Sequence, residues 1–376
     1  MNEELIRNSR RSEGAIPFES NREPLAFHRK LPGYELTPLV ESAPLAKLLG
    51  VGRVLLKVES SRLGLPAFKM LGASWAIYQT LCGRLGFEPE WSTLQELNVA
   101  IDPLRPLSLA AATDGNHGRA VARMAKLLGF GAHIFVPDDM TQARIDAIKS
   151  EGAEVTIVEG TYDDAVAQSA TAANDRCLVI SDTSWPGYID PPRQVIEGYA
   201  TIFAEIDDQL AATNSAQPTV VFLPCGVGAF AAAGVAYYRN AGHGTTLITV
   251  EPADAACVLE SIRKSEMVEV PGPHRSMMVG LNCGNASLIA FPVLQQGLDY
   301  AVAIGDDRAA KAMRLLDAEG IESGETGAAS LAGALGVLEL GGGPLVGFDA
   351  DATVLCIVTE GATDPSNYER IVGHAP

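Results

Sequence analysis

Lys69 is the residue of this sequence best placed to do covalent chemistry. It lies in the apolar segment FKMLGA, at 68–73, where a predicted strand gives way to a predicted helix. Burying a lysine charge is costly unless the charge is paired or the amine changes its chemical state. Condensation with an aldehyde is one such change, and it would make the amine a covalent anchor. The ordinary alternative is a lysine at a helix start, whose stem covers apolar neighbours while its ammonium reaches water.

A glycine turn with polar side chains, TDGNHG at 113–118, follows a predicted strand and opens a predicted helix. Its glycines permit a tight turn and let a ligand approach the backbone closely. The start of a helix presents free N–H groups to an anion such as a substrate carboxylate. Asp-Gly turns with asparagine are also ordinary loop chemistry, and His117 on its own is compatible with a purely structural role.

A second glycine turn, CGVGA at 225–229, lies between a predicted strand and an alanine-rich predicted helix. Small residues there expose several backbone amides beside the positive end of a helix, which suits a phosphate group. Two of these glycines, with Gly234, partly match the dinucleotide fingerprint G-x-G-x-x-G, but the third glycine is displaced. Glu251, at the end of the next predicted strand, keeps a nucleotide-dependent oxidoreductase open as an alternative.

A third turn, TEGATD at 359–364, follows the last predicted strand. The hydroxyl of Thr359 could hydrogen-bond a ring nitrogen without placing a charge beside it. The same threonine could instead serve as a turn or helix-capping residue. The motifs together provide a candidate covalent amine, an anion site, a phosphate loop and a ring contact.

These motifs are set in a regular alternation of strand-like and helix-like segments, which predicts an α/β fold with parallel sheets covered by helices. In such sheets ligands bind beyond the carboxyl ends of the strands, where the motifs lie. A proline-containing, weakly periodic stretch at 86–106 is predicted to be a loop or insertion near a lobe boundary. The predicted strands are 54–58, 107–112, 132–136, 155–158, 178–181, 220–223, 247–250 and 353–358, and the predicted helices are 69–81, 119–128, 141–149, 163–173, 195–210, 229–238, 308–318 and 328–338.

Length and net charge limit the domain organisation and the kinds of partner that this chain can have. A chain of 376 residues is long enough for two lobes or domains. The formal net charge of −18 argues against nucleic acid and against anionic membrane surfaces as partners. The longest apolar run, near 229–238, is too short to span a bilayer. Glu3 and Glu4 stand where a secretory signal would be apolar, so a soluble cytoplasmic protein is expected.

The six cysteines show no C-x-x-C spacing, so a zinc site is not expected. Their scatter along the chain suits buried free thiols in a cytoplasmic protein. No other metal-binding pattern stands out, and no metal is predicted.

The motifs resemble those of the fold-type II pyridoxal-phosphate enzymes, which include threonine dehydratase, cysteine synthase and the tryptophan synthase β chain. The closer resemblance is to the diaminopropionate ammonia-lyase family. Asp114 is the most specific feature, because the wider superfamily usually has serine or alanine at that position. The element DTSWPGY at 182–188 is the second. The matching stretches are 67–73, 112–119, 181–188, 278–284 and 359–361, within a similarity that spans about 27–373.

The resemblance implies two lobes, each with a mostly parallel twisted sheet flanked by helices. The large lobe would comprise residues 1–73 and 193–376, and the small lobe residues 74–192. It also implies a homodimer. Cys257 and Cys283 match positions that can approach each other in the family, so a disulfide is possible there, with free thiols as the default expectation.

The resemblance further implies that pyridoxal 5'-phosphate is the cofactor, held covalently by the amine of Lys69. Asn116 would contact the 3'-oxygen of the pyridine ring, and Thr359 would face the ring nitrogen. Asp114 and Asp182 would be active-site carboxylates. The phosphate-binding residues would be Gly226, Val227, Gly228 and Ala229.

The activity implied is the α,β-elimination of 2,3-diaminopropionate to pyruvate and ammonia. Lys69 would serve one face of the substrate and Asp114 the other, so both enantiomers are expected to react. Besides the nucleotide-dependent oxidoreductase, three alternatives stay open at this point. They are a serine/threonine or hydroxyaspartate dehydratase, a β-replacement synthase, and an amino-acid or cofactor-binding protein without turnover.

Overall fold

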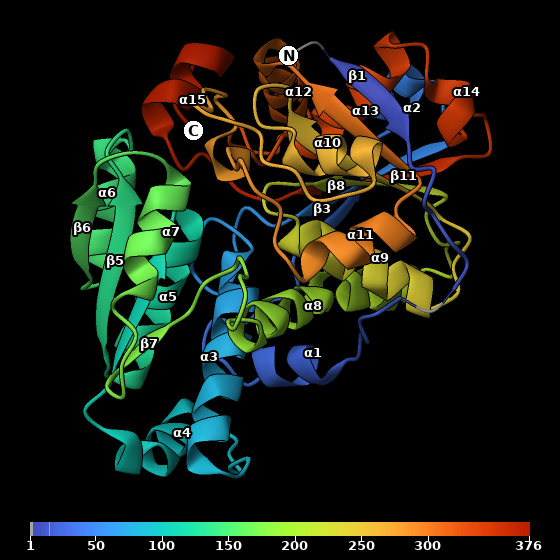
Figure 1. Cartoon of the computed structure of the whole chain (residues 1–376). Coiled ribbons are helices and arrows are strands. Elements are labelled where there is room, and N and C mark those ends of the chain that lie inside the picture. The colour runs from blue at the N-terminus through green and yellow to red at the C-terminus, as the bar shows by residue number, and fades with distance from the viewer. Residues whose placement is uncertain (1–2, 15) are drawn as a thin grey trace.

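Two β-sheets form the framework of the protein (Figure 1). The computed structural model describes residues 3–14 and 16–376. Neighbouring strands of the larger sheet are parallel, except for its two edge strands, which pair antiparallel. Its strands lie in the order β1 (Glu4–Arg7), β10 (Tyr300–Ile304), β9 (Thr246–Pro252), β8 (Val220–Pro224), β11 (Thr353–Val358), β3 (Arg53–Val58) and β2 (Leu39–Glu41).

The smaller sheet is parallel throughout. Its strands lie in the order β6 (Glu154–Val158), β5 (Gly131–Pro137), β4 (Ser108–Ala112) and β7 (Cys177–Val179). The central strand β4 reads SLAAA, and its alanines are buried. Such small side chains let α5 (Asn116–Leu128) and α7 (Tyr162–Ala170) pack closely against β4.

Helices cover the larger sheet, whose central strands β8 and β11 are buried along their whole length. In the described ranges no helix is long and apolar enough to cross a membrane. The helices on this side of the molecule are α2 (Ala43–Leu49), α9 (Ala229–Asn240), α10 (Cys257–Lys264), α11 (Ala290–Gly297), α12 (Asp306–Ala318), α13 (Ala329–Glu339), α14 (Gly343–Val346) and α15 (Pro365–Val372).

Two long helices link the sheets: α3 (Lys69–Leu85) and α8 (Asp190–Ala212) pack along each other, with α1 (Glu23–His28) beside them (Figure 1). Helix α3 also packs on α5 of the smaller sheet. Glycines allow the close approach: a Cβ on Gly72 would lie 2.5 Å from the Tyr199 ring, and one on Gly198 would lie 2.5 Å from the Leu71 carbonyl oxygen. The helix that begins at Lys69 is therefore fixed against α8.

The predicted alternation of strands and helices is confirmed, with ends that move by a few residues. The stretch at 86–106, predicted to be a loop or insertion, is not a loop throughout, because it contains α4 (Leu94–Ala100) and a 3-10 turn at Asp102–Leu104. Helix α4 begins with a capping box between Thr93 and Glu96, a T-x-x-E signal that is visible in the sequence. Further elements were not predicted from the sequence: the short edge strands β1 and β2, strand β10, and helices α1, α2, α10, α11, α14 and α15.

Candidate active site

One cavity is lined by residues from all the sequence motifs. Asp114 follows β4, Asp182 follows β7, residues 226–229 follow β8, and Thr359 follows β11. The carboxyl ends of strands from both sheets therefore meet at this cavity, as expected for ligand sites of parallel sheets.

Lys69 is the first residue of α3, and its position is fixed by the loop that follows β11. The amide of Phe68 donates to the Thr359 carbonyl at 3.3 Å, and the amide of Gly361 donates to the Pro66 carbonyl at 3.0 Å. The expectation of a direct strand-to-helix turn is wrong in one respect, because residues 59–68 lie between β3 and α3. These backbone bonds bring the amine and Thr359 to the same cavity.

The Lys69 ammonium is paired with a buried carboxylate. Its Nζ donates to Asp182 Oδ2 at 2.7 Å, and the side chains are 19% and 7% exposed. The Tyr162 hydroxyl donates to the other oxygen of Asp182 at 2.9 Å. Burial opposes both charges, but their mutual attraction raises the pKa of Lys69 and holds the pKa of Asp182 well below its usual range. The pair is therefore charged, and Asp182 can hold the amine in place.

Asp114 lies close enough to feel the charges of both members of this pair. Burial raises the pKa of Asp114, the Lys69 charge lowers it, and the charge of Asp182 raises it again. A buried carboxyl group beside a charged amine is a suitable proton-transfer group. Because two carboxyl groups surround one lysine, the cavity can also accommodate the positive charge of a further ammonium group.

Asn116 begins α5, directly after Gly115, whose φ of 145° is a conformation that favours glycine. Its side-chain amide donates to Oε2 of the buried Glu360. The other oxygen, Oε1, is buried and has no hydrogen-bond partner among the described residues. Burial raises the pKa of Glu360. Glu360 and Tyr162 were not predicted as site residues from the sequence, although Glu360 directly follows Thr359 in its motif.

The loop after β8 has the form of a phosphate site. Gly228 adopts a φ of 96° and precedes α9, whose first turn has no side-chain cap. The first amides of a helix have no partner within the helix, so they are available to an anion. A Cβ on Gly226 would lie 3.0 Å from Cys283 Sγ and 3.3 Å from the Gly280 carbonyl oxygen. The residues at 226–229 therefore fit a phosphate group held by backbone amides.

Two further side chains complete the cavity. Thr359 is buried, and its hydroxyl makes a long hydrogen bond of 3.3 Å to the Thr326 carbonyl, so it can turn towards a ring nitrogen. His117 Nε2 lies 2.8 Å from the carbonyl oxygen of Ile180, and burial lowers the pKa of the imidazole. This carbonyl bond and neutral ring fit the structural role of His117. The polar groups of the cavity thus suit a neutral aromatic ring with a phosphate.

The geometry does not support a nucleotide-binding role for Glu251 and Gly234. Glu251 accepts hydrogen bonds from the amides of Val258 and Leu259, both at 2.8 Å, at the start of α10. Burial raises the pKa of Glu251 to about 8. Gly234 allows close packing, because a Cβ there would lie 2.8 Å from a methyl group of Leu223. Both residues therefore have structural roles.

The six cysteines are free thiols in the structure. Cys257 Sγ lies 3.7 Å from the Gly226 carbonyl oxygen, and Cys283 is next to the same glycine, so both thiols border the phosphate loop. Over the described part of the chain, no group of three or more His, Cys, Asp or Glu side chains could hold a metal ion.

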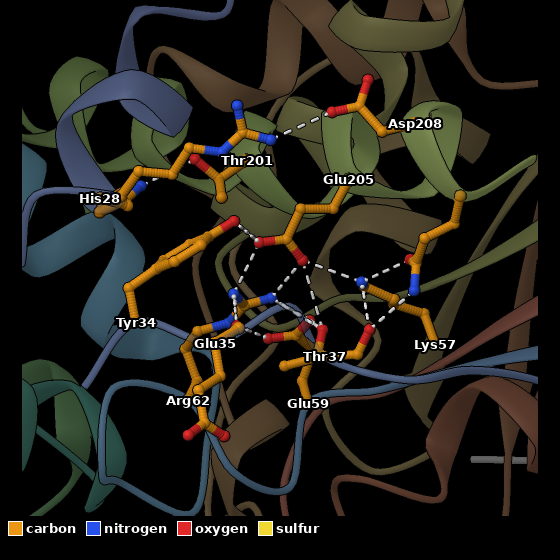
Figure 2. Close-up of polar contacts among 12 residues, drawn as sticks. His28, Tyr34, Glu35, Thr37, Lys57, Glu59, Arg62, Thr201, Glu205 and Asp208 are labelled. Atoms are coloured by element: carbon orange, nitrogen blue, oxygen red, sulfur yellow. Dashed lines mark hydrogen bonds and ion pairs between the residues drawn. The ribbon is translucent and has the colours of Figure 1, made fainter. Parts of the chain in front are cut away.

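A buried ionic cluster fixes residues 59–68, the loop that carries Lys69. Glu205 of α8 accepts hydrogen bonds from Arg62, with both contacts at 2.7 Å, and from Lys57 at 2.9 Å (Figure 2). Arg62 also donates to Glu59. The side chains of these four residues are fully buried. Nearly two helical turns earlier on α8, the ring centroid of Tyr199 lies 4.8 Å from that of Phe68. Helix α8 therefore holds both ends of the loop.

We expect Glu205→Gln to lower the free energy of unfolding by about 3–5 kcal/mol, because it leaves Arg62 and Lys57 buried with less opposing charge. Asp208→Asn is the matched control on the same helix. Asp208 is 42% exposed and pairs with Arg22, so its loss should change stability by less than about 1 kcal/mol. Urea unfolding at pH 7 measures both, and similar small effects would contradict the assignment.

The same cluster predicts acid sensitivity. Although burial opposes ionisation, Arg62 and Lys57 lower the pKa of Glu205 to about 2. The stabilisation is therefore present above the unfolded-state pKa of 4.5 and is lost as the pH falls towards 2. Glu205→Gln should weaken this part of the pH dependence.

The chain belongs to the pyridoxal-phosphate dependent enzyme family, whose model matches residues 30–360. A diaminopropionate ammonia-lyase from Salmonella typhimurium is 36% identical over 369 residues, which cover 93% of this chain and 91% of the relative. At this identity and coverage, the chain belongs with the diaminopropionate ammonia-lyases inside that family.

Two solved structures of the diaminopropionate ammonia lyase from Escherichia coli have the same fold. The selenomethionine holo structure matches with a TM-score of 0.91 at 34% identity, covering 99% of this chain and 97% of that chain. A complex with an aminoacrylate-PLP azomethine reaction intermediate matches with a TM-score of 0.89 at 33% identity and the same coverage. The predicted fold class, family and cofactor are therefore confirmed.

Proposed function

We propose that this protein is an ammonia-lyase that converts 2,3-diaminopropionate to pyruvate and ammonia with pyridoxal phosphate. The observation that carries the proposal is the position of the Lys69 amine, 2.7 Å from Asp182 and close to Asp114, in a cavity with a phosphate loop. The names of the Salmonella and E. coli relatives support the same activity.

Each motif would contact a different part of the cofactor. Lys69 would bind it covalently, the amides at 226–229 would bind its phosphate, and Asn116 would contact the oxygen of the ring. Thr359 would hydrogen-bond the ring nitrogen. When bound, the cofactor supplies an electron sink that stabilises negative charge at the substrate Cα.

The remaining chemistry is proton transfer, which Lys69 and Asp114 would carry out. Once its amine is free of the cofactor, Lys69 can take the Cα proton from one face of the substrate. The Asp114 carboxylate can take it from the other face, and a positioned base of this kind contributes about 10²–10⁴-fold. Asp182 would hold the ammonium form of Lys69 in place. The amine at Cβ would leave as the first ammonia after it has gained a proton, and hydrolysis of the released enamine by one water would give pyruvate and the second ammonia.

Side-by-side turnover of 2,3-diaminopropionate and L-serine tests this proposal. The buried carboxyl groups can make charge-assisted hydrogen bonds to a second ammonium group, which serine lacks. Each such bond contributes about 1.5–3 kcal/mol, so we expect at least a tenfold preference for diaminopropionate in kcat/KM. Pyruvate release from purified protein is the readout.

The same assay separates the alternatives. Faster turnover of serine, threonine or hydroxyaspartate would identify a dehydratase. Product formation only in the presence of an added nucleophile would identify a β-replacement synthase. A yellow protein that releases no keto acid from any amino acid would be a binding protein.

We further propose that the chain works as a cytoplasmic homodimer, with residues 74–192 as the small lobe. Six free thiols suit a reducing compartment. The four strands of the smaller sheet all lie inside 74–192, which supports these boundaries. Light scattering of the purified protein would test the dimer, since a monomer mass would contradict it. Native-state hydrogen exchange would test the boundaries, since the four strands of the smaller sheet should exchange as one unit that differs from the larger sheet.

A further inference from the structure

A second cavity, of about 400 Å³, lies between the two sheet units and next to the catalytic one. On one side it is lined by Arg144 of α6 (Gln142–Ser150), a helix that packs on the smaller sheet. On the other side it is lined by Glu325 and by residues at the start of α15, which belongs with the larger sheet (Figure 1). Neither Lys69 nor Asp182 lines this cavity.

Arg144 is a buried cation without a bonded partner. It is 8% exposed, and its guanidinium makes no hydrogen bond or ion pair with any residue in the described ranges. Its charge acts on Asp114 and Glu360 only at longer range. The stem of the side chain packs on Gly115, with Cδ 3.4 Å from where a Cβ would be. Arg144 lines the cavity with its guanidinium unpaired, so an anionic group from a ligand could form a charge-assisted hydrogen bond with it.

Glu325, in contrast, has a carboxylate oxygen that lacks a hydrogen-bond donor. It is 2% exposed, and its Oε1 accepts a hydrogen bond from the Asn367 side chain. Its Oε2 is buried and has no hydrogen-bond partner among the described groups. A buried acceptor without a partner is unfavourable, so a donor from a ligand would be favourable at this atom.

The other charged residues of the cavity are already engaged. Asp364 caps α15 by accepting from the Asn367 amide at 3.1 Å. Arg370 donates to the side-chain oxygen of Asn367. Asp364 is half-buried and Arg370 is exposed, so Arg144 and Glu325 are the buried charged residues of this cavity among those that the structure describes.

We propose that this cavity binds a small zwitterionic amino acid, with its carboxylate on Arg144 and its ammonium on Glu325. An inorganic anion would satisfy Arg144 but would meet the carboxylates of Glu325 and Asp364. A simple cation would satisfy Glu325 but would face two guanidinium groups. Because Arg144 and Glu325 come from opposite sides of the cleft, the ligand bridges the two sheet units. The site is separate from the proposed catalytic function and does not depend on it.

Calorimetric titration of the holoenzyme with N-methylglycine tests the site. This probe is a zwitterion, and its secondary amine cannot form a neutral imine with the cofactor. We expect one molecule bound per chain, and at least about tenfold weaker binding to Arg144→Gln and to Glu325→Gln, since each loses a charge-assisted hydrogen bond. Lys149→Gln, an exposed lysine on the same helix, is the matched control and should bind normally.

Two further binding measurements complete the test. Acetate and methylammonium, which each carry one of the two charges, should bind at least about tenfold more weakly than N-methylglycine. Borohydride reduction of the holoenzyme should leave binding unchanged, because the site is outside the catalytic cavity. Absence of binding to the wild type, wild-type affinity in both variants, or loss of binding after reduction would each overturn the proposal. Glu325→Gln keeps the shape of the side chain, so a folding defect in Arg144→Gln would not hide the answer.

Discussion

Lys69→Ala is expected to lower the turnover of diaminopropionate by at least about 10⁴-fold and to remove the visible absorbance of the purified protein. The first effect follows because the variant loses the base for one substrate face and the group that releases the product. The second follows because the cofactor loses its covalent anchor. Pyruvate release and an absorbance spectrum measure the two effects.

Lys126→Ala is a suitable control, because it removes an exposed lysine from α5 and should change neither property. A thermal unfolding curve shows whether Lys69→Ala remains folded. If the visible band survives in a folded Lys69→Ala protein, the covalent lysine is a different one.

Asp114→Asn is expected to separate the two enantiomers of diaminopropionate. Its carboxyl group is assigned to one face of the substrate and Lys69 to the other, so only one enantiomer should lose its base. We expect kcat for that enantiomer to fall by about 10²–10⁴-fold, with a much smaller change for the other. Pyruvate release from each pure enantiomer is the measurement.

A charge control is needed, because removing a carboxylate also weakens the attraction for a substrate ammonium. Asp138→Asn changes an exposed carboxylate in the cavity beside Asp114 and should affect both enantiomers equally and weakly. Equal, large losses for both enantiomers in Asp114→Asn would contradict the assignment to two faces.

The main parts of the site could be predicted from sequence because each lies just after a buried strand. Asp114 follows β4, the glycines at 226–229 follow β8, and Thr359 follows β11. Parallel strands place their carboxyl ends on one edge, so local patterns were enough to predict that these residues would meet. Lys69 is brought to the cavity in a different way, by backbone hydrogen bonds between its loop and the segment after β11.

The residues that were missed depend on contacts that no local pattern encodes. Asn116 bonds to Glu360 across 244 positions of the chain, and Arg62 bonds to Glu205 across 143. In the sequence, Glu205 looks like a residue on the exposed polar face of a long helix. Its burial follows only from the packing of α8. The edge strands β1 and β2 are three or four residues long, and they become strands by pairing with β10 and β3.

The account depends on a covalent link between the cofactor and one particular amine. Borohydride reduction of the holoenzyme, followed by proteolysis and mass spectrometry of the peptides, tests this link directly. The account predicts one pyridoxyl adduct, on the peptide that contains Lys69. An adduct on another lysine, or on none, would contradict it.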